Sequence, residues 1–252
     1  MSEHGQKIGR QTPGAVLRVG IVVTAQFTLN ALANFVDALR LASDDGDRSR
    51  PLRCHWNLMS ATQVPLRSSC GFQIAPTSTL LDFDQLDYIA VIGRLLHRGR
   101  PIDETLRGYL LRAGKAGVPL VGICTGSFVL CRLGLMTGRK CCISWYHYHD
   151  FLEEFDAMVP VADELYVIDG DRITSSGGIG AALAAAHLVE RHLDAGSAQK
   201  APRIMQIVRT RSTAATNRRR RSPCPTMTSA SHGRFSRWSK TSLALSTPRR
   251  VR

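Results

Sequence analysis

The sequence predicts an α/β fold in which a parallel sheet is covered by helices on both faces. Two observations predict it: short, continuous apolar runs of strand length, and segments with helical spacing of apolar residues between them. A strand buried on both faces is apolar at nearly every position, as in parallel sheets. The alternation of such strands with helices indicates a layered α/β domain.

The strands and helices can be placed in chain order. Continuous apolar or β-branched runs predict strands at residues 17–23, 54–60, 72–74, 87–93 and 118–124. Apolar residues at helical spacing predict helices at residues 29–42, 104–117, 127–138 and 179–193. Gly117 is a suitable helix stop, and the Asp169–Gly170 turn predicts a hairpin of two short strands. Ligands of such sheets bind at the carboxyl ends of the strands, here just after Val23, Ile92 and Ile123.

Composition and charge limit the classes of protein. The chain has 252 residues, is 44% hydrophobic and 21% charged, and carries a net charge of +13. Residues 1–200 hold 20 basic and 20 acidic side chains, whereas residues 201–252 hold 13 basic side chains and no acidic one. This distribution excludes a uniformly basic nucleic-acid-binding globule. No apolar run approaches the roughly 18 residues of a membrane span, which argues against an integral membrane protein.

The same pattern predicts three parts. We expect a flexible leader at residues 1–15, a folded domain at residues 16–196 and a disordered, basic, low-complexity tail at residues 197–252. The run Arg218–Arg221 could contact phosphates, but without selectivity. The tail contains no helix pair of a DNA-binding domain, and its composition leads to the hypothesis of a truncated or frameshifted reading frame. The polar N-terminus and the seven cysteines, an odd number, predict reduced thiols and a cytoplasmic location.

Cys124 is the most informative residue. It ends a buried strand and directly precedes a helix in the segment GICTGS, the arrangement of a nucleophile elbow. Gly122 and Gly126 leave room for the sharp turn. The helix N-terminus favours the thiolate form and offers backbone N–H groups to an anion, and Gly93 could donate a second N–H. The simpler alternative is that Cys124 is a small buried apolar residue.

Two segments carry a family resemblance: GICTGSFVLCRLGLMTGRKCCISWYHYHDF and ELYVIDGDRITSSGGIGAALAAAHLVERH. They resemble the PfpI/ThiJ-like domain of the class I glutamine-amidotransferase superfamily, and more narrowly the amino-terminal half of AraC-type transcriptional regulators. The resemblance covers roughly residues 16–200. It implies a flavodoxin-like three-layer sandwich with a mostly parallel sheet and a cytoplasmic effector-sensing role. Relatives with a stretch like WYHY are associated with amino acids or quaternary amines such as betaines.

Two departures from the family pattern argue against catalysis. Superfamily enzymes carry a histidine in a stretch like TTHW, and alignment on Trp145 places Ser144 at that position, where a hydroxyl cannot act as a base near neutral pH. His147 is displaced along the chain by several ångströms. A related branch places a glutamate after the first strand, but residues 19–36 contain no acidic side chain.

A binding pocket at the elbow is therefore the favoured interpretation. The aromatic stretch 145–149 could bind a quaternary ammonium group through ring faces, while the elbow N–H groups take a carboxylate. We expect the ligand to contact Gly93, Cys124, Thr125, Trp145, His147, Asn30 and Ser176. The alternatives are that the aromatic residues belong to the core or an interface, and that Ser175 and Ser176 cap the next helix.

Other functions remain open at this level. A cysteine-dependent hydrolase or glyoxalase-like enzyme would use Cys124 with His147, and an oxidant sensor would use Cys124 alone. Cys141, Cys142, His147 and His149 match no common zinc spacing, so neither a metal nor a cofactor is expected. The resemblance implies a homodimer, a small-molecule effector and DNA as partners, without a membrane; the short tail predicts that specific DNA binding is impaired.

Overall fold

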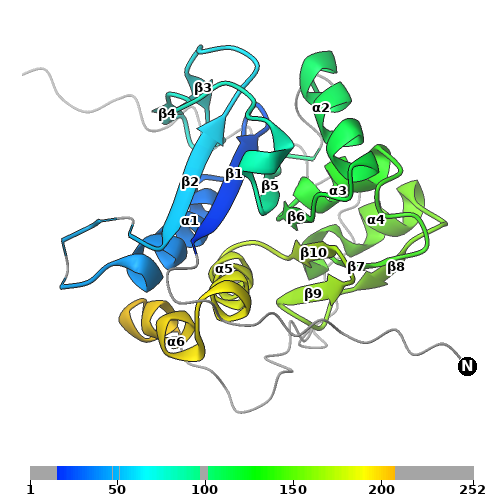
Figure 1. Ribbon diagram of the computed structural model, residues 1–252. Helices are drawn as coiled ribbons and strands as arrows, with labels where there is room; N and C mark the ends of the chain where they lie inside the picture. Colours follow the sequence, from blue (N-terminus) through cyan, green and yellow to red (C-terminus); the bar gives the residue numbers. More distant parts are fainter. Residues whose placement is uncertain (1–15, 47, 51, 97–101, 208–252) are drawn as a thin grey trace, which may run out of the picture. The chain divides into compact units, whose positions relative to one another are not determined.

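A computed structural model describes residues 16–46, 48–50, 52–96 and 102–207 (Figure 1). These residues belong to the first of two units of the chain, Met1–Arg218, and the second unit lies outside them. The predicted leader at residues 1–15 and the part of the predicted tail at residues 208–252, with the Arg218–Arg221 run, therefore lie outside the described residues. Within the described part, no helix has the length and apolar character needed to cross a membrane.

A six-stranded sheet forms the centre of the domain. Its order is β2-β1-β5-β6-β10-β9, and all neighbours are parallel except β9 and β10. The five parallel strands follow the order 2-1-3-4-5 of flavodoxin-like sheets, as the resemblance implies. The strands are β1 (Leu17–Val23), β2 (Cys54–Met59), β5 (Tyr88–Ile92), β6 (Leu120–Ile123), β9 (Tyr166–Asp169) and β10 (Arg172–Ser175).

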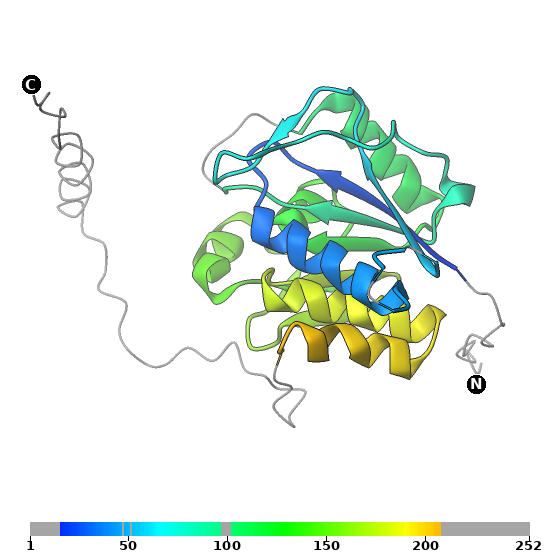
Figure 2. The ribbon, with the colours of Figure 1, turned by 90° about the vertical axis from the view of Figure 1, so that its left-hand side faces the viewer.

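Helices cover both faces of the sheet, which confirms the predicted layers. Helices α1 (Leu29–Ser43), α5 (Ile179–His192) and α6 (Ala195–Ile204) lie side by side on one face (Figure 2). Helices α2 (Glu104–Lys115) and α3 (Gly126–Arg132) belong to the other core. Alternate residues of a strand enter opposite cores, since side chains alternate along a strand: Ala90 and Ile92 face α1 and α5, whereas Ile89 and Val91 face α2 and α3.

Most predicted elements are confirmed, including the antiparallel hairpin at Asp169–Gly170. The helix predicted at residues 127–138 is too long. It ends at Arg132, because Gly134 adopts a positive φ of 70°, a backbone conformation that stops a helix. The segment that follows holds elements that we did not predict: β7 (Lys140–Cys142), the 3₁₀ turn η2 (Trp145–His147), α4 (Tyr148–Glu154) and β8 (Val159–Val161).

The folded domain also extends beyond the boundary predicted at residue 196. Helix α6 begins at Ala195 and continues to Ile204, through residues that we assigned to the tail, and it packs against α1 and α5. Asp194 caps its N-terminus by accepting a hydrogen bond from the Ser197 backbone N–H at 2.7 Å. The Lys200 ammonium donates to the Asp44 carbonyl after α1. These tertiary contacts stabilise a helix whose own sequence, with Gly196 and Pro202, has low helix propensity.

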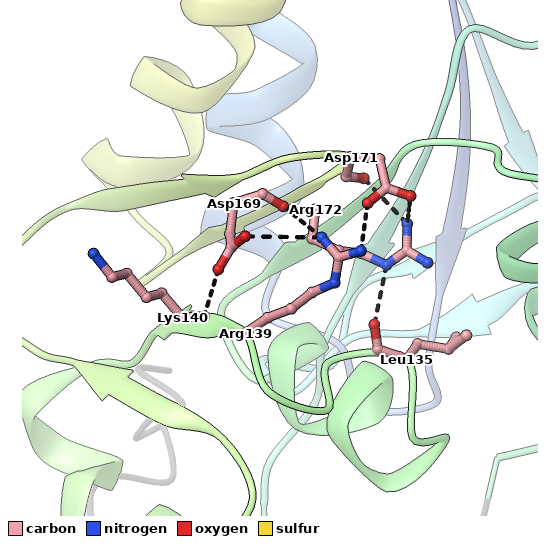
Figure 3. A network of polar contacts seen from close by, with 6 residues as sticks. All are labelled: Leu135, Arg139, Lys140, Asp169, Asp171 and Arg172. Atoms are coloured by element: carbon pink, nitrogen blue, oxygen red, sulfur yellow. Dashed lines mark hydrogen bonds and ion pairs between the residues drawn. The ribbon is translucent and has the colours of Figure 1, made fainter. Parts of the chain in front are cut away.

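A polar network closes the end of the sheet where β10 begins (Figure 3). The Arg172 side chain is buried; its Nε donates to the Leu135 carbonyl at 3.0 Å, and it also pairs with Asp171. Arg139 pairs with Asp171 at 2.9 Å and donates to the Asp169 carbonyl at 2.8 Å. The network thus ties the β9–β10 hairpin to the segment between α3 and β7.

The two small sheets and a remaining 3₁₀ turn complete the described chain. They consist of β3 (Leu66–Arg67) with β4 (Gln73–Ile74), β7 with β8, and η1 (Phe83–Gln85). The β3–β4 hairpin lies against the segment before α1: the Gln26 N–H donates to the Arg67 carbonyl, and the Ser69 N–H donates to the Phe27 carbonyl. It therefore supports the loop that leads from β1 into α1.

Candidate functional site

Cys124 forms the sharp turn between β6 and α3 that the sequence predicts. Its φ is 57°, in the left-handed region that side chains other than glycine rarely adopt. Its N–H donates to the Ser175 carbonyl at 2.9 Å, and its carbonyl accepts from Ser127 Oγ at 2.9 Å. Such strain, about 1–3 kcal/mol, persists only where the surrounding structure enforces it. The half-buried thiol is thereby held at the carboxyl edge of the sheet.

Gly93 and Gly126 allow α3 to approach the end of β5. A Cβ atom at Gly126 would lie 1.9 Å from the Val91 carbonyl oxygen, and one at Gly93 would lie 2.0 Å from the Gly126 nitrogen. The Gly93 N–H donates to the Ile123 carbonyl at 3.0 Å. The expectation that Gly93 supplies a second anion donor is therefore wrong, because the sheet uses that N–H; its contribution to the site is the space it leaves.

The N-terminal ends of three helices meet at the thiol. Thr28, the N-cap of α1, places Oγ1 at 3.8 Å from Cys124 Sγ, and α3 begins two residues after Cys124. On the side of α5, a Cβ at Gly177 would lie 3.0 Å from Cys124 Cβ and 3.4 Å from Sγ. Helix N-termini carry partial positive charge. The sequence predicted one of these ends, and the structure adds two.

The immediate polar environment of the sulfur is a hydroxyl. Thr28 Oγ1 is its hydrogen-bonding partner, and among the described residues neither a carboxylate nor an imidazole nitrogen lies within hydrogen-bonding distance of Cys124 Sγ. Thr28 belongs to the segment in which the sequence shows no acidic residue. A neutral hydroxyl can donate to or accept from the thiol, but it does not take up its proton near neutral pH.

The aromatic stretch follows β7 on the flank of α3. Ser144 Oγ accepts from the Tyr146 N–H at 3.4 Å and caps the turn η2. His147 Nδ1 lies 2.9 Å from Asp150 Oδ2, and its ring meets the Phe128 ring edge-on with centroids 6.1 Å apart. Trp145 is 56% exposed and Tyr146 is 70% exposed. Of the rings of Trp145, Tyr146 and His147, the imidazole of His147 is thus the one that packs against α3.

The other predicted contact residues have structural partners. Thr125 is buried and its Oγ1 donates to the Arg94 carbonyl. Ser176 Oγ donates to the Leu165 carbonyl at 3.3 Å, which ties the turn before α5 to the segment before β9. Asn30 is exposed at the start of α1; its Oδ1 accepts from Asn34 Nδ2, while its own Nδ2 lies close to Gly178.

Three other cysteines are buried with structural partners. Cys131 and Cys141 are buried with their sulfur atoms 3.9 Å apart, and this contact together with burial raises the pKa of the Cys131 thiol. The Cys142 thiol donates to the Glu164 carbonyl, and burial raises its pKa to about 12. Over the described ranges, no three side chains of the types that bind metals form a cluster.

Sequence reasoning missed four residues of the site. Thr28 precedes the apolar pattern of α1, a helix-start signal whose side chain we did not connect to Cys124. The pair Gly177–Gly178 indicates positive φ, and both residues adopt it, at 90° and 54°. Asp150 lies three residues after His147, within reach on a helical turn.

Comparison with known proteins agrees with this fold. Residues 19–191 match the model of the DJ-1/PfpI family. The chain is 30% identical over 173 residues to the HTH-type transcriptional regulator GbdR of Pseudomonas aeruginosa, covering 69% of this chain and 46% of that protein. It is 35% identical over 114 residues to isonitrile hydratase of Pseudomonas putida, covering 45% of this chain and 49% of that protein.

A solved structure shows the same architecture. The crystal structure of an AraC family transcriptional regulator from Pseudomonas putida superposes with a TM-score of 0.63 at 21% identity, covering 75% of this chain and 99% of that chain. The chain spans about half the length of the curated relatives described above.

Proposed function

Because the chain belongs to the DJ-1/PfpI family, we propose that its described domain is the effector-sensing domain of an AraC-type transcriptional regulator. In this proposal a small amino acid or quaternary amine binds at the Cys124 elbow and is not chemically changed. The similarity to an HTH-type transcriptional regulator supports the regulatory role.

The environment of the thiol is the observation that carries the proposal. A cysteine hydrolase needs a base in hydrogen-bonding contact with the nucleophile, so that the proton can be taken up and returned. Thr28 Oγ1 occupies that place at 3.8 Å, and His147, whose Nδ1 is bonded to Asp150, makes no hydrogen bond to the sulfur. Among the described residues, an elbow without a proton acceptor in contact with Cys124 Sγ supports recognition rather than turnover.

The two kinds of surface at the site support a zwitterionic ligand. The helix N-termini at Thr28, Cys124 and Gly177 favour a carboxylate. The turn η2 offers aromatic rings and an imidazole to an amine. A small amino acid or betaine carries both groups within a few bonds, so that one molecule could bridge the elbow and the turn.

The partners follow from the same proposal. We propose that the domain acts in the cytoplasm as a homodimer and that DNA is the partner of the regulator, with specific DNA binding impaired in this chain. Light scattering of the full chain should give twice the mass of one chain. A mobility-shift titration should show weak retardation that does not depend on DNA sequence; sequence-specific retardation would contradict the DNA part of the proposal.

Calorimetric titration of the full chain tests the ligand. Amino acids and betaines are titrated singly, and we expect saturable binding by at least one of them, with a change in Trp145 fluorescence detected by comparison with Trp145→Phe. Cys124→Ser should retain binding, since the proposal includes no reaction at the sulfur. If no amine or amino acid binds the full chain, the ligand assignment is overturned.

One observation favours a second function, a cysteine-dependent hydrolase or glyoxalase-like enzyme. A base oriented by a carboxylate is part of such sites, and His147 is held by Asp150; isonitrile hydratase is also among the similar proteins. Ester, amide and methylglyoxal turnover that disappears in Cys124→Ala would establish it. The regulator proposal expects no turnover above that of Cys124→Ala.

A further inference from the structure

The pair of His147 and Asp150 has a defined hydrogen-bond geometry. Nδ1 of His147 lies 2.9 Å from Asp150 Oδ2, and the two side chains are 18% and 31% exposed. The residues are three apart, where the chain passes from η2 into α4. The imidazole also meets the rings of Phe128 and Tyr146 edge-on, with centroids 6.1 and 5.0 Å away. The ring is therefore held in one orientation from three sides.

This contact decides which nitrogen of the neutral ring carries the hydrogen. An ionised carboxylate only accepts hydrogen bonds, so Nδ1 must be the donor to Asp150. The lone pair then resides on Nε2, the nitrogen on the other side of the ring. The same arrangement orients histidines that bind through Nε2 in other proteins. His147 thus presents a hydrogen-bond acceptor on the side away from Asp150.

The imidazole lies beside the elbow. Phe128, whose ring it contacts, lies in the first turn of α3, four residues after Cys124. On the other side, β7 leads into the turn η2, and the Cys142 N–H donates to Thr174 Oγ1 at 2.7 Å. The next residue of β10, Ser175, accepts the N–H of Cys124. The strand β7 that leads to His147 is therefore bonded to the end of β10 that also holds Cys124.

The rings of Trp145 and Tyr146 do not form a cage around one point. Trp145 and Tyr146 are mostly exposed, and their rings meet edge-on rather than presenting two faces to one point. A quaternary ammonium group is bound best when several ring faces exclude water from it. An ammonium group that keeps an N–H can instead donate a charge-assisted hydrogen bond to a ring nitrogen.

From this geometry we propose that Asp150 is a positioning residue and His147 the residue that selects the amine. Nε2 of His147 accepts a hydrogen bond from the ammonium N–H of the ligand, and the site prefers amines that keep at least one N–H over fully N-methylated ones. This inference rests on the proposed function and narrows its ligand class to primary, secondary and tertiary ammonium compounds.

A series of N-methylated glycines tests it on the full chain. Glycine and its N-methyl, N,N-dimethyl and N,N,N-trimethyl derivatives share one carboxylate, and only the last lacks an ammonium N–H. Calorimetry should show an affinity loss of about tenfold at the last methylation. In Asp150→Asn this loss should shrink to threefold or less. The side-chain amide can also donate to Nδ1, so the hydrogen of the ring is no longer fixed on Nδ1 and the lone pair is no longer fixed on Nε2. Glu153→Gln, the same charge change at an exposed position of α4, should keep the tenfold step.

Nitrogen-15 spectra of the imidazole provide a readout that a purely structural role would not move. The Nε2 resonance of His147 should show the lone-pair state in the free protein and shift when dimethylglycine binds, and Asp150→Asn should mix the two tautomers. Trimethylglycine that binds as tightly as dimethylglycine would overturn this inference and leave the proposed function standing. If none of the four binds, the inference is overturned, and the wider amine titration decides the proposed function separately.

Discussion

The two ends of strand β10 differ in what their polar groups do. At its first residue, Arg172 is buried among Asp171, the Leu135 carbonyl and Arg139 of the same network, so that charges and hydrogen bonds are matched (Figure 3). At its last residue, Ser175 holds the strained turn of Cys124, whose sulfur has one weak partner among the described residues, Thr28. The first end stabilises the hairpin. The last end holds the Cys124 thiol, with few hydrogen bonds, at the edge where ligands of such sheets bind.

Asp171→Ala should strongly destabilise the Arg172 end of β10. The variant leaves the Arg172 guanidinium, whose side chain is 6% exposed, without its carboxylate. Burial already lowers the pKa of Arg172, which indicates that the charge is poorly solvated. We expect a loss of about 3 kcal/mol in the free energy of unfolding, measured by urea denaturation. The exposed pair of Arg40 and Asp37 provides the control, since Asp37→Ala should lose less than about 1 kcal/mol. Equal losses would contradict the role of burial.

Gly177→Ala tests how tightly the Cys124 end of β10 is packed. The substitution forces a side chain into a φ of 90° and brings a methyl group 3.0 Å from Cys124 Cβ. We expect about 2 kcal/mol of destabilisation in the same measurement. Gly117 has a φ of 76° and open space around it, so Gly117→Ala isolates the backbone contribution, about 1 kcal/mol. A Gly177→Ala loss no larger than that of Gly117→Ala would show that the approach to Cys124 is loose.

The sequence predicts the sheet and the elbow because both depend on local patterns. Continuous apolar runs identify β1, β5 and β6, and the glycines around Cys124 mark its turn. The partners of Cys124 are not local: Thr28 is 96 residues away, and only the strand order brings it to the sulfur. Helix α6 was missed for a similar reason, since packing on α1 and α5 overrides its weak propensity. Helix α4 is a single short element whose buried Phe151 carries little periodic signal.

The pH dependence of stability probes a third place, the end of α5 remote from Cys124. His192 Nε2 lies 3.1 Å from the Tyr88 hydroxyl, and burial lowers the pKa of His192 below 6.5; burial also lowers the pKa of His187. The folded state therefore binds fewer protons than the unfolded chain. The two neutral histidines therefore contribute their full stability above their unfolded pKa of about 6.5. This stability is lost as the pH falls from 6.5 toward their lower pKa values in the folded state.

We expect the unfolding free energy to decline between pH 7.5 and pH 5.5 in urea titrations at constant salt. His192→Gln should reduce this decline, and the double variant with His187→Gln should reduce it further. A decline that is as steep in the double variant as in the unsubstituted protein would assign the pH dependence to other groups.

Thiol labelling needs no substitution and is expected to have the smallest effect on stability, since the thiol that should react first lies at neither end of β10. Cys70 is exposed, and a hydrogen bond from Ser68 lowers its pKa, so iodoacetamide should label it first among the cysteines of the described residues. Cys124, half-buried, should follow. Burial raises the pKa of Cys54 to about 12, and this thiol should stay unlabelled until the protein unfolds. Peptide mass spectrometry reads the order, and labelling of Cys54 before Cys124 in the folded protein would contradict it.

Helix α5 connects the Cys124 site to α6, the last helix of the described residues. It starts directly after Gly177 and Gly178, and its other end leads into α6 and on to Ile207. A helix of 14 residues is about 21 Å long. A molecule that displaces Gly177 would therefore act on the first turn of α5, whose other end lies about 21 Å away and leads into α6.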